Sequence, residues 1–308
     1  MTARNIGFEV QEFEAHRRHL LGVAYRMLGT ASEAEDMVQE AWLRWQDAPR
    51  HDVLNARSYL TTVVTRLCLD VMKSARVQRE QYVGQWLPEP IPADEYIDEN
   101  SPEAHAEAME SISFAAMVLL EKLGPVERAV FLLRDVFDFD YNEIAHVVGS
   151  DEASCRQTLR RARQHLTESR TRFHSTYEER LQLTAQFMLA AGMGDFSGLR
   201  NLLAEDVVEY GDGGGRVRAG IHPIYGREKV LRLIEHTAKL FAGAEARIIN
   251  LNGAPAMVML RDGEPTDVAF LEVAAGRIHE LRFIRNPEKL GAVRKLLAPP
   301  PVSLPAKG

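Results

Sequence analysis

The sequence predicts two all-helical domains followed by a C-terminal α+β domain. Helical patterns of apolar residues run from about residue 8 to 80 and again from 112 to about 173, with a segment rich in proline and acidic residues between them. After residue 178, two helices, a glycine-rich turn and a third helix precede short alternating segments. These segments are separated by Asn-Gly, Asp-Gly and Ala-Gly pairs, which are typical of antiparallel strands. A chain of 308 residues has room for two or three such domains.

The composition argues against a membrane, secreted or metal-binding protein. Hydrophobic residues make up 45% and charged residues 26% of the chain, as in an ordinary core-forming protein. No apolar run reaches the roughly 18–20 residues of a membrane span, and the N-terminus lacks a signal peptide, so we expect a cytoplasmic protein without membrane contact. Cys68 and Cys155 fall within helical apolar patterns. We therefore expect buried, reduced thiols and neither a metal nor a cofactor.

The net charge of −7 conceals a strong separation of charge. From Gln81 to Glu121 there is no lysine or arginine, while acidic residues accumulate. From Arg156 to Arg172 there are six arginines, and Glu168 is the only acidic residue. This asymmetry indicates a polyanion-binding element beside an acidic segment that could repel or mimic the polyanion.

The first domain, expected over residues 1–82, contains a helix with two distinct faces in SEAEDMVQEAWLRW. Its inner face carries Met37, Val38, Ala41 and Trp45, and its outer face carries Asp36, Gln39 and Glu40. Like charges four residues apart cost a helix a few tenths of a kcal/mol, about 0.2–0.5. An exposed acidic stripe beside Trp42 therefore suits docking against a basic partner, although an ordinary solvated face is equally compatible.

Residues 83–111 are expected to form an acidic, proline-containing linker. The stretch VGQWLPEPIPADEYIDENSPE holds too many prolines for a regular helix. Within it, WLPEP is a stiff, extended segment with one large apolar anchor, Trp86, which suits docking on another domain.

The next domain, expected over residues 112–175, contains a predicted helix-turn-helix. Asp140 can cap a helix with Glu143 at the capping-box position, Gly149 ends that helix, and Ser150 or Asp151 can cap the next one. The second helix turns an apolar stripe inward (Cys155, Leu159, Ala162 and Leu166) and polar groups outward (Gln157, Arg160, Arg161 and Gln164). Guanidinium and amide groups suit base edges in a major groove, so DNA binding is favoured over the alternative of a solvated, arginine-rich surface helix.

Two blocks of sequence resemble one known family. DMVQEAWL, which starts at Asp36, resembles the signature helix of region two of the extracytoplasmic-function sigma factors, in the sigma-70 family. LGPVERAVFLLRDVFDFDYNEIAHVVGSDEASCRQTLRRARQHL resembles their region four. The blocks stand in the family's order and cover roughly residues 8–172. The resemblance implies an alternative sigma factor, which binds core RNA polymerase and directs promoter-specific initiation of transcription.

The resemblance also implies roles for particular residues. The residues expected to contact the clamp helices of the largest core subunit are Asp36, Gln39, Glu40 and Trp42. Contact with the minus-ten element of promoter DNA falls on Arg57, Arg66, Lys73 and Arg76. Contact with the minus-thirty-five element falls on Ser154, Arg156, Gln157, Arg160 and Arg161. Tyr59 offers a stacking surface for a base or, alternatively, is a half-buried core residue.

The C-terminal domain, expected over residues 178–297, resembles SnoaL-like members of the nuclear transport factor 2-like superfamily, which are cone-shaped α+β domains with a pocket. One subgroup of sigma factors carries such a domain, and three motifs here resemble its marks: Trp86-Leu87-Pro88-Glu89-Pro90, Asp212-Gly213-Gly214-Gly215-Arg216 and Asn286-Pro287-Glu288-Lys289-Leu290. In that subgroup the extra domain modulates sigma activity in cis. Residues 298–308 are expected to be disordered.

The three motifs predict an interdomain regulatory contact. Its expected members are Trp86, Leu87, Pro88, Asp212, Gly213, Gly214, Asn286, Pro287 and Leu290. If Trp86 docks near Asp212 or Asn286, the linker sets the spacing of regions two and four, and hence their fit to promoter elements at a set separation. The alternative is that Trp86 packs on region two and the linker is passive.

A regulatory rather than enzymatic C-terminal domain is expected, with a small molecule in its pocket as a candidate partner. Acid–base catalysis would draw on Asp195, Asp206, Asp212, His222 or Tyr225. The aspartates and His222 each have a local explanation in a cap, turn or loop, in particular a helix end for Asp206 and a glycine-rich turn for Asp212. A rival interpretation is a one-component helix-turn-helix regulator with a ligand-sensing or enzymatic C-terminal domain. The helix from Asp36 to Trp42 and the separate linker favour the sigma factor.

Overall fold

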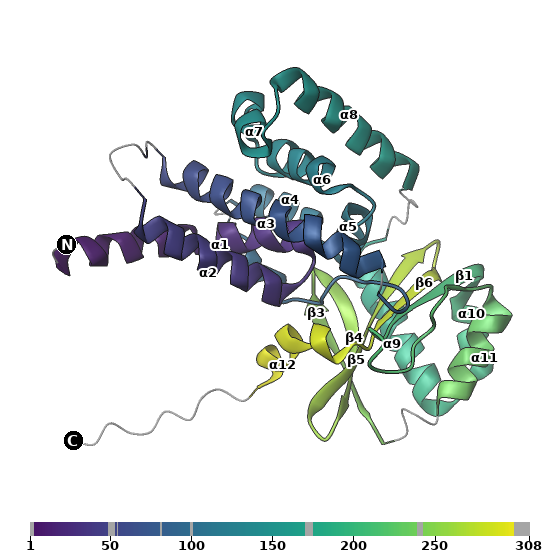
Figure 1. The fold of residues 1–308 in the computed structure, drawn as a ribbon. Helices are drawn as coiled ribbons and strands as arrows, with labels where there is room; N and C mark the ends of the chain where they lie inside the picture. The colour runs from purple at the N-terminus through teal and green to yellow at the C-terminus, as the bar shows by residue number, and fades with distance from the viewer. Residues whose placement is uncertain are drawn as a thin grey trace, which may run out of the picture.

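The computed structural model of the chain describes residues 3–48, 53, 55–80, 82–98, 101–169, 175–238 and 243–298. All of the expected disordered tail, residues 298–308, except Ala298 lies outside this description, and so does the side chain of Arg76. In Figure 1 the helices α1 to α8 form one half of the molecule and the sheet with its helices forms the other, and the two halves lie against each other. The predicted fold class of helical domains followed by an α+β domain is confirmed. None of the described helices combines the length and apolar character that a membrane span requires.

The first three helices, α1 (Ala3–Leu28), α2 (Ala31–Gln46) and α3 (Ala56–Glu80), pack into a bundle. On α2, Val38, Ala41 and Trp45 are no more than 1% exposed, because spacings of three and four residues place them on one side of the helix. Cys68 of α3 is fully buried as a free thiol. The bundle thus presents the opposite side of α2 outward.

The linker is extended in its first half only. From residue 82 to 98 it contains a single short turn of 3-10 helix, η2 (Ala93–Tyr96). Helix α4 (Pro102–Ile112) then begins with proline in its first turn, where no backbone donor is lost, and Ser101 Oγ accepts a hydrogen bond from the Ala104 backbone N–H. The predicted linker of residues 83–111 therefore includes a regular helix from Pro102 onward.

The second helical domain comprises α5 (Phe114–Leu120), α6 (Pro125–Phe131), a π-helical turn η3 (Leu132–Val136), α7 (Tyr141–Val148) and α8 (Glu152–Ser169). Gly149 ends α7 with a left-handed φ of 69°. Asp151 Oδ1 then accepts the Ser154 backbone N–H at 2.9 Å and caps α8. The predicted inward stripe of α8 is buried at Cys155 and Leu159. These two helices form the predicted helix-turn-helix.

The α+β domain contains a six-stranded sheet in the order β2-β1-β6-β5-β4-β3. The strands are β1 (Leu203–Asp212), β2 (Ile224–Tyr225), β3 (Glu245–Leu251), β4 (Ala254–Arg261), β5 (Glu264–Ala274) and β6 (Arg277–Ile284). The helices are α9 (Tyr177–Met193), α10 (Phe196–Leu202), α11 (Arg227–Thr237) and α12 (Gly291–Leu297), with a 3-10 turn η5 (Pro287–Lys289).

One strand of this sheet corrects the sequence analysis. The predicted helix FSGLRNLLAED ends at Leu202, and its last residues open β1, which pairs in parallel with the central strand β6. The sheet is therefore mixed rather than wholly antiparallel. The physical reason is that Val208 and Tyr210 favour a strand and pair with Glu280 and Arg282 of β6, which local sequence cannot reveal.

The two faces of the sheet have different partners. Helices α9, α10 and α11 cover one face with an apolar core that includes Phe187, Leu199 and Leu271. The opposite face packs on the linker and on α5, where the rings of Phe114 and Phe270 stack with centroids 4.0 Å apart. In Figure 1, α10 and α11 lie at the end of the molecule away from the helical half. The sheet thus serves as the contact surface between the α+β domain and the rest of the chain.

Candidate functional site

The outer face of α2 is accessible. Asp36 and Gln39 are exposed, and Glu40 forms an ion pair with Arg44 of the same helix at 3.3 Å. Trp42 is half-buried and meets the ring of Phe13 edge-on, with centroids 5.1 Å apart. These four predicted residues form an acidic surface with an aromatic side chain, which can accept a basic partner.

The α+β domain reaches the edge of this surface. Lys295 of α12 lies 2.9 Å from the carboxylate of Glu35, the neighbour of Asp36. Both side chains are well exposed, so the pair contributes little to stability but places α12 beside α2.

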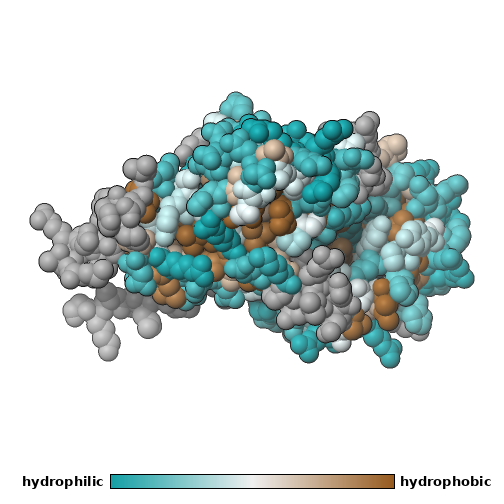
Figure 2. All heavy atoms as spheres, turned by 45° about the horizontal axis from the view of Figure 1, so that its top comes forward, coloured by the Kyte–Doolittle hydropathy of each residue, from teal (hydrophilic) through white to brown (hydrophobic). Residues whose placement is uncertain are grey.

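The outer face of α8 carries the predicted DNA-contacting residues: Ser154, Arg156, Gln157, Arg160 and Arg161 are all exposed. Arg156 pairs with Glu152 and stacks over the ring of Tyr141 at 4.6 Å. Gln157 and Arg160 have no hydrogen bond or ion pair within the described part of the chain. Figure 2, which brings the top of Figure 1 forward, shows a largely hydrophilic surface over α7 and α8. The helix therefore presents donors that nucleic acid can use.

Arg66, one of the predicted cations of α3, has protein partners. Arg66 donates to the backbone carbonyl of His146 at 2.6 Å and to that of Val147 at 3.2 Å, both at the end of α7. Ser58 of α3 donates to Glu143 of α7 at 3.0 Å. The helix-turn-helix is thus docked on α3, and Arg66 is occupied by it.

Arg57 and Lys73, which are also predicted to contact the minus-ten element, each lie beside one neighbouring side chain. Arg57 is exposed with one nitrogen 3.1 Å from Nδ1 of His19, and Lys73 pairs with Asp70 at 3.0 Å. Tyr59 is half-buried and packs its ring 5.8 Å from that of Trp45. That position agrees with the core alternative for Tyr59.

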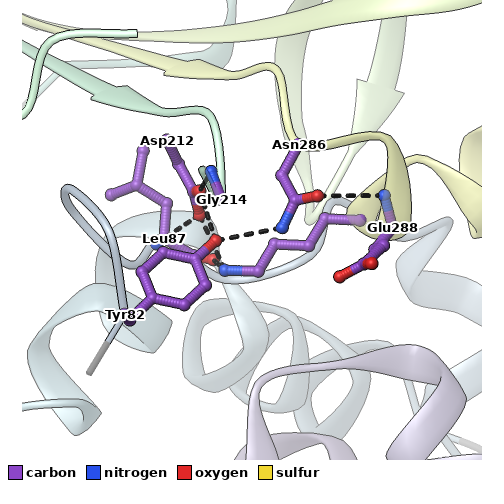
Figure 3. A network of polar contacts seen from close by, with 7 residues as sticks. Tyr82, Leu87, Asp212, Gly214, Asn286 and Glu288 are labelled. Carbon is purple, nitrogen blue, oxygen red and sulfur yellow. Dashed lines mark hydrogen bonds and ion pairs between the residues drawn. The ribbon is translucent and has the colours of Figure 1, made fainter. Parts of the chain in front are cut away.

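A buried polar network joins the linker to two loops of the α+β domain (Figure 3). Asp212, at the end of β1, accepts from the Leu87 backbone N–H at 2.9 Å and from the Tyr82 hydroxyl at 2.5 Å. Lys289 donates to the other side of the same linker residue, the Leu87 carbonyl, at 2.6 Å and to Asp212 at 2.7 Å. Asn286 donates its side-chain amide to the Tyr82 hydroxyl at 3.0 Å. The linker backbone at Leu87 is therefore held by both of its hydrogen-bonding groups.

Glycine is required at the centre of this network. Gly214 has a left-handed φ of 59°, and a Cβ atom there would overlap the side-chain amide of Asn286. A Cβ at the neighbouring Gly213 would overlap the backbone carbonyl of Val217. The close approach of these loops thus explains two glycines of the DGGGR motif.

Trp86 contacts both domains that the sequence analysis considered. Its ring lies 3.9 Å from the ammonium of Lys289 in the α+β domain. On the other side, a Cβ added to Gly29, in the turn between α1 and α2, would overlap the indole. The structure thus combines the two alternatives, because Trp86 packs on the first helical domain and on the α+β domain at once.

Glu89 connects the N-termini of two helices. Its buried carboxylate accepts from the Ala31 N–H at 2.7 Å and from the Ala292 N–H at 3.3 Å, at the starts of α2 and α12. Burial raises the pKa of Glu89, and the backbone hydrogen bonds partly oppose this. One linker side chain thereby ties the first domain to the last.

Asn252, in the turn between β3 and β4, is a second such connection. Its fully buried amide donates to the Tyr25 hydroxyl at 2.9 Å and to the Ile112 carbonyl at 3.0 Å, and its oxygen accepts from the Ile91 N–H at 3.0 Å. The turn therefore touches α1, the linker and the end of α4.

The remaining predicted interdomain residues lie at the same junction. Pro88 and Leu290 are buried, and Pro287 begins η5. Sequence reasoning did not single out Tyr82, Glu89, Asn252 and Lys289. Glu89 and Lys289 stood inside the motifs, while Asn252 was taken only as part of an Asn-Gly turn signal.

The candidate catalytic residues do not form a site. Asp195 caps α10 at the Gly198 N–H, Asp206 lies exposed within β1 rather than at a helix end, and Asp212 belongs to the interdomain network. His222 and Tyr225 are exposed. Only one of the bonds of Asp212, to the Gly214 N–H at 3.1 Å, is the local turn contact that the sequence suggested. No two of the five contact each other by a hydrogen bond or ion pair among the described residues.

Comparison with known proteins identifies both helical domains. The family model for sigma-70 region 2 matches residues 13–77, and the model for sigma-70 region 4 matches residues 113–166. The ECF RNA polymerase sigma factor SigJ of Mycobacterium tuberculosis is 38% identical over 293 residues, covering 91% of this chain and 93% of the relative. The probable ECF sigma factor SigI of the same species is 32% identical over 288 residues, covering 92% of this chain and 94% of the relative.

The similarity extends to the third domain. The crystal structure of Mycobacterium tuberculosis SigJ superposes with a TM-score of 0.70 at 34% identity, covering 92% of this chain and 98% of that one. Because this coverage includes the α+β part, the arrangement of all three domains has a counterpart in a solved structure.

Proposed function

Because the chain belongs to the extracytoplasmic-function sigma factors, and so is an alternative sigma factor that directs transcription initiation, we propose that its SnoaL-like domain controls in cis when the sigma domains can bind core RNA polymerase and promoter DNA. Its place of action is that of its polymerase, the cytoplasm. The interdomain contacts support this proposal, because they hold regions two and four in one fixed arrangement.

The proposed contact with core RNA polymerase is the outer face of α2. Asp36, Gln39, Glu40 and Trp42 offer negative charge and one aromatic side chain to the clamp helices of the largest subunit. Charge complementarity of this kind speeds encounter and fixes register more than it adds affinity.

The proposed contact with the minus-thirty-five element is the outer face of α8. Gln157 and Arg160 are exposed and have no partner within the described ranges, while Arg161 is only 3.8 Å from Glu127. An arginine without an internal partner breaks no internal contact when it binds guanine or phosphate, so Arg160 is the strongest candidate.

The arrangement described is a closed state. Arg66, a proposed minus-ten contact, is bound to the backbone of α7, so the two promoter-reading domains are held face to face. Promoter elements stand apart along DNA, and the contact between α3 and α7 must therefore open before both can be read. The observation that carries this proposal is that Asp212 accepts from the Leu87 backbone N–H while Lys289 donates to the Leu87 carbonyl.

The SnoaL-like domain is proposed to act as a regulator rather than an enzyme. The residues suited to acid–base chemistry are capped, exposed or committed to the interdomain network, as described above. The side of the sheet under α9, α10 and α11 is lined with packed apolar side chains.

In vitro transcription with purified core polymerase on a genomic promoter library tests the proposal. Gly214→Ala introduces a Cβ against Asn286 and should loosen the linker, which raises transcript yield per bound sigma factor. Gly192→Ala is the matched control, because a Cβ there meets nothing within 4 Å. Equal yields from both variants and the unmodified protein would refute control by this interface.

A further inference from the structure

A cavity of about 1030 Å³ lies at the junction of the domains. One wall comes from the linker and α4, with Trp86 and Met109, and a second from α5, with Ala116 and Leu119. The third wall comes from the sheet and the start of α9. The sheet residues involved lie on the face opposite α9, α10 and α11, so this space is separate from the apolar core beneath those helices.

Charged side chains line the sheet wall. Glu272, Glu280 and Arg282 are each at most 9% exposed, and Arg282 pairs with Glu280 and lies 3.5 Å from Glu272. The ring of Tyr210 lies 5.3 Å from the guanidinium of Arg282. Burying three charged side chains on this face of the sheet costs stability. A well-packed apolar cluster would serve a purely structural role better.

Polar atoms without partners gather around this cavity. In the described part of the chain, residues that line it hold four buried side-chain polar atoms with neither a hydrogen bond nor an ion pair: Gln85 Nε2, Ser175 Oγ, Arg180 Nε and Arg282 Nε. Three of them are nitrogen donors and the hydroxyl of Ser175 can donate as well. Buried polar groups are nearly always satisfied, so a group of donors along one cavity indicates an occupant that supplies acceptors.

The remaining wall is apolar. Trp86, Met109, Val118 and Leu119 face the same space from the linker, α4 and α5. Ligand pockets combine such apolar surface with a few polar groups that fix orientation.

We propose that this interdomain cavity binds a small amphipathic carboxylate, with its apolar body on α5 and the linker and its carboxylate toward Arg180 and Arg282. Small rotations of the two guanidinium groups turn their unpaired donors to the ligand. A carboxylate suits them because arginine pairs with it through parallel hydrogen bonds.

The position of the cavity gives the ligand a regulatory consequence, which rests on the proposed function. Its walls come from the linker, region four and the SnoaL-like domain, so an occupant that touches all three favours the closed state. Binding itself does not depend on polymerase. A failure of binding therefore leaves the proposed control by the interdomain network standing, and binding without an effect on transcription would affect only the regulatory consequence.

Titration calorimetry on the full-length protein tests the proposal with three probes that differ only in the head group: 4-phenylbutyrate, 4-phenylbutanol and 4-phenylbutylamine. We expect one saturable site, with the carboxylate binding at least about tenfold more tightly than the other two. Ala116→Trp, which fills the cavity without changing its charge, should abolish binding of the carboxylate. Arg282→Gln should reduce its affinity about tenfold and leave that of the alcohol unchanged.

Arg200→Gln is the matched control, because Arg200 is an exposed arginine of the same domain, ion-paired with Glu228 and outside the cavity. Thermal unfolding shows whether each variant is folded. If Arg282→Gln is unfolded, the binding measurement on Ala116→Trp decides the test. The proposal is overturned if no probe saturates a site, if the amine or the alcohol binds as tightly as the carboxylate, or if Ala116→Trp binds it normally.

Discussion

The ammonium of Lys289 lies 2.7 Å from the carboxylate of Asp212, and the two side chains are only 5% and 0% exposed. They belong to the two loops that close on the linker, and both bind Leu87. A buried ion pair is stable only when its remaining hydrogen-bonding capacity is satisfied, and the linker backbone satisfies it here. The pair is therefore complete only while the linker is docked.

Lys289→Met should destabilise the protein, because it leaves Asp212 charged, buried and without its cation. Removing one member of a buried pair costs about 3–5 kcal/mol. Urea unfolding followed by tryptophan fluorescence measures the loss, since Trp86 lies on Lys289. The double variant with Asp212→Asn should recover part of it, and an unchanged unfolding midpoint in Lys289→Met would show that the pair does not hold the junction.

Arg160→Ala should weaken promoter binding without affecting the fold, because Arg160 is exposed and has no hydrogen bond or ion pair within the described segments. A lost base contact costs about 1–3 kcal/mol of binding free energy, and a lost phosphate contact lowers the salt dependence. Promoter binding by the polymerase holoenzyme, measured over a range of salt concentrations, reports both. Arg163→Ala is the control, since Arg163 is held by Asp135. If the holoenzymes with Arg160→Ala and Arg163→Ala bind the promoter with equal affinity, the outer face of α8 does not read the promoter.

Asp36→Lys combined with Glu40→Lys should abolish binding to core polymerase and leave the fold intact, because neither side chain is buried. The reversed charges would repel a basic partner surface. Glu14→Lys on the exposed side of α1 makes the same kind of change outside the proposed surface. A pull-down with core enzyme distinguishes them, and retained binding by the double variant would place the interface elsewhere.

Glu209 predicts a pH dependence of stability. It is 4% exposed, its Oε2 has no hydrogen bond among the described residues, and burial raises its pKa to about 7, with Arg285 opposing the shift. A carboxyl whose pKa is raised on folding stabilises the fold while it is protonated, and that contribution disappears as the pH rises through the folded-state pKa. Glu209→Gln should therefore be more stable than the unmodified protein above about pH 7, by up to about 3 kcal/mol, and about equal near pH 4. Equal stability at about pH 8, measured by urea unfolding, would contradict the buried, ionisable state.

The helices of the helical half, and the side of α8 that is buried, could be predicted from local sequence patterns. In α8, the spacing of Cys155 and Leu159 set which side is buried, and Gly149 and Asp151 mark the turn before it. Each of these signals depends on residues within a few positions, where helix geometry and capping chemistry decide the outcome.

The junction could be predicted only in part, because its contacts join distant residues. Resemblance to motifs pointed to Asp212 and Asn286, but their partner Tyr82 carried no signal in the sequence. Asn252 and Tyr25 stand 227 positions apart, and nothing local in an Asn-Gly turn reveals that its amide reaches α1. The same holds for Arg66, whose carbonyl partners at the end of α7 have no recognisable side-chain pattern.

The distance between the two promoter-reading domains tests the closed state most directly. Gln46→Cys on α2 and Ala153→Cys on α8 place spin labels at exposed positions, and the native Cys68 and Cys155 are too buried to react. Pulsed electron paramagnetic resonance on the free protein should give one narrow distribution, which core polymerase should move to longer distances. An identical distribution in the free protein and in the polymerase complex would contradict the account.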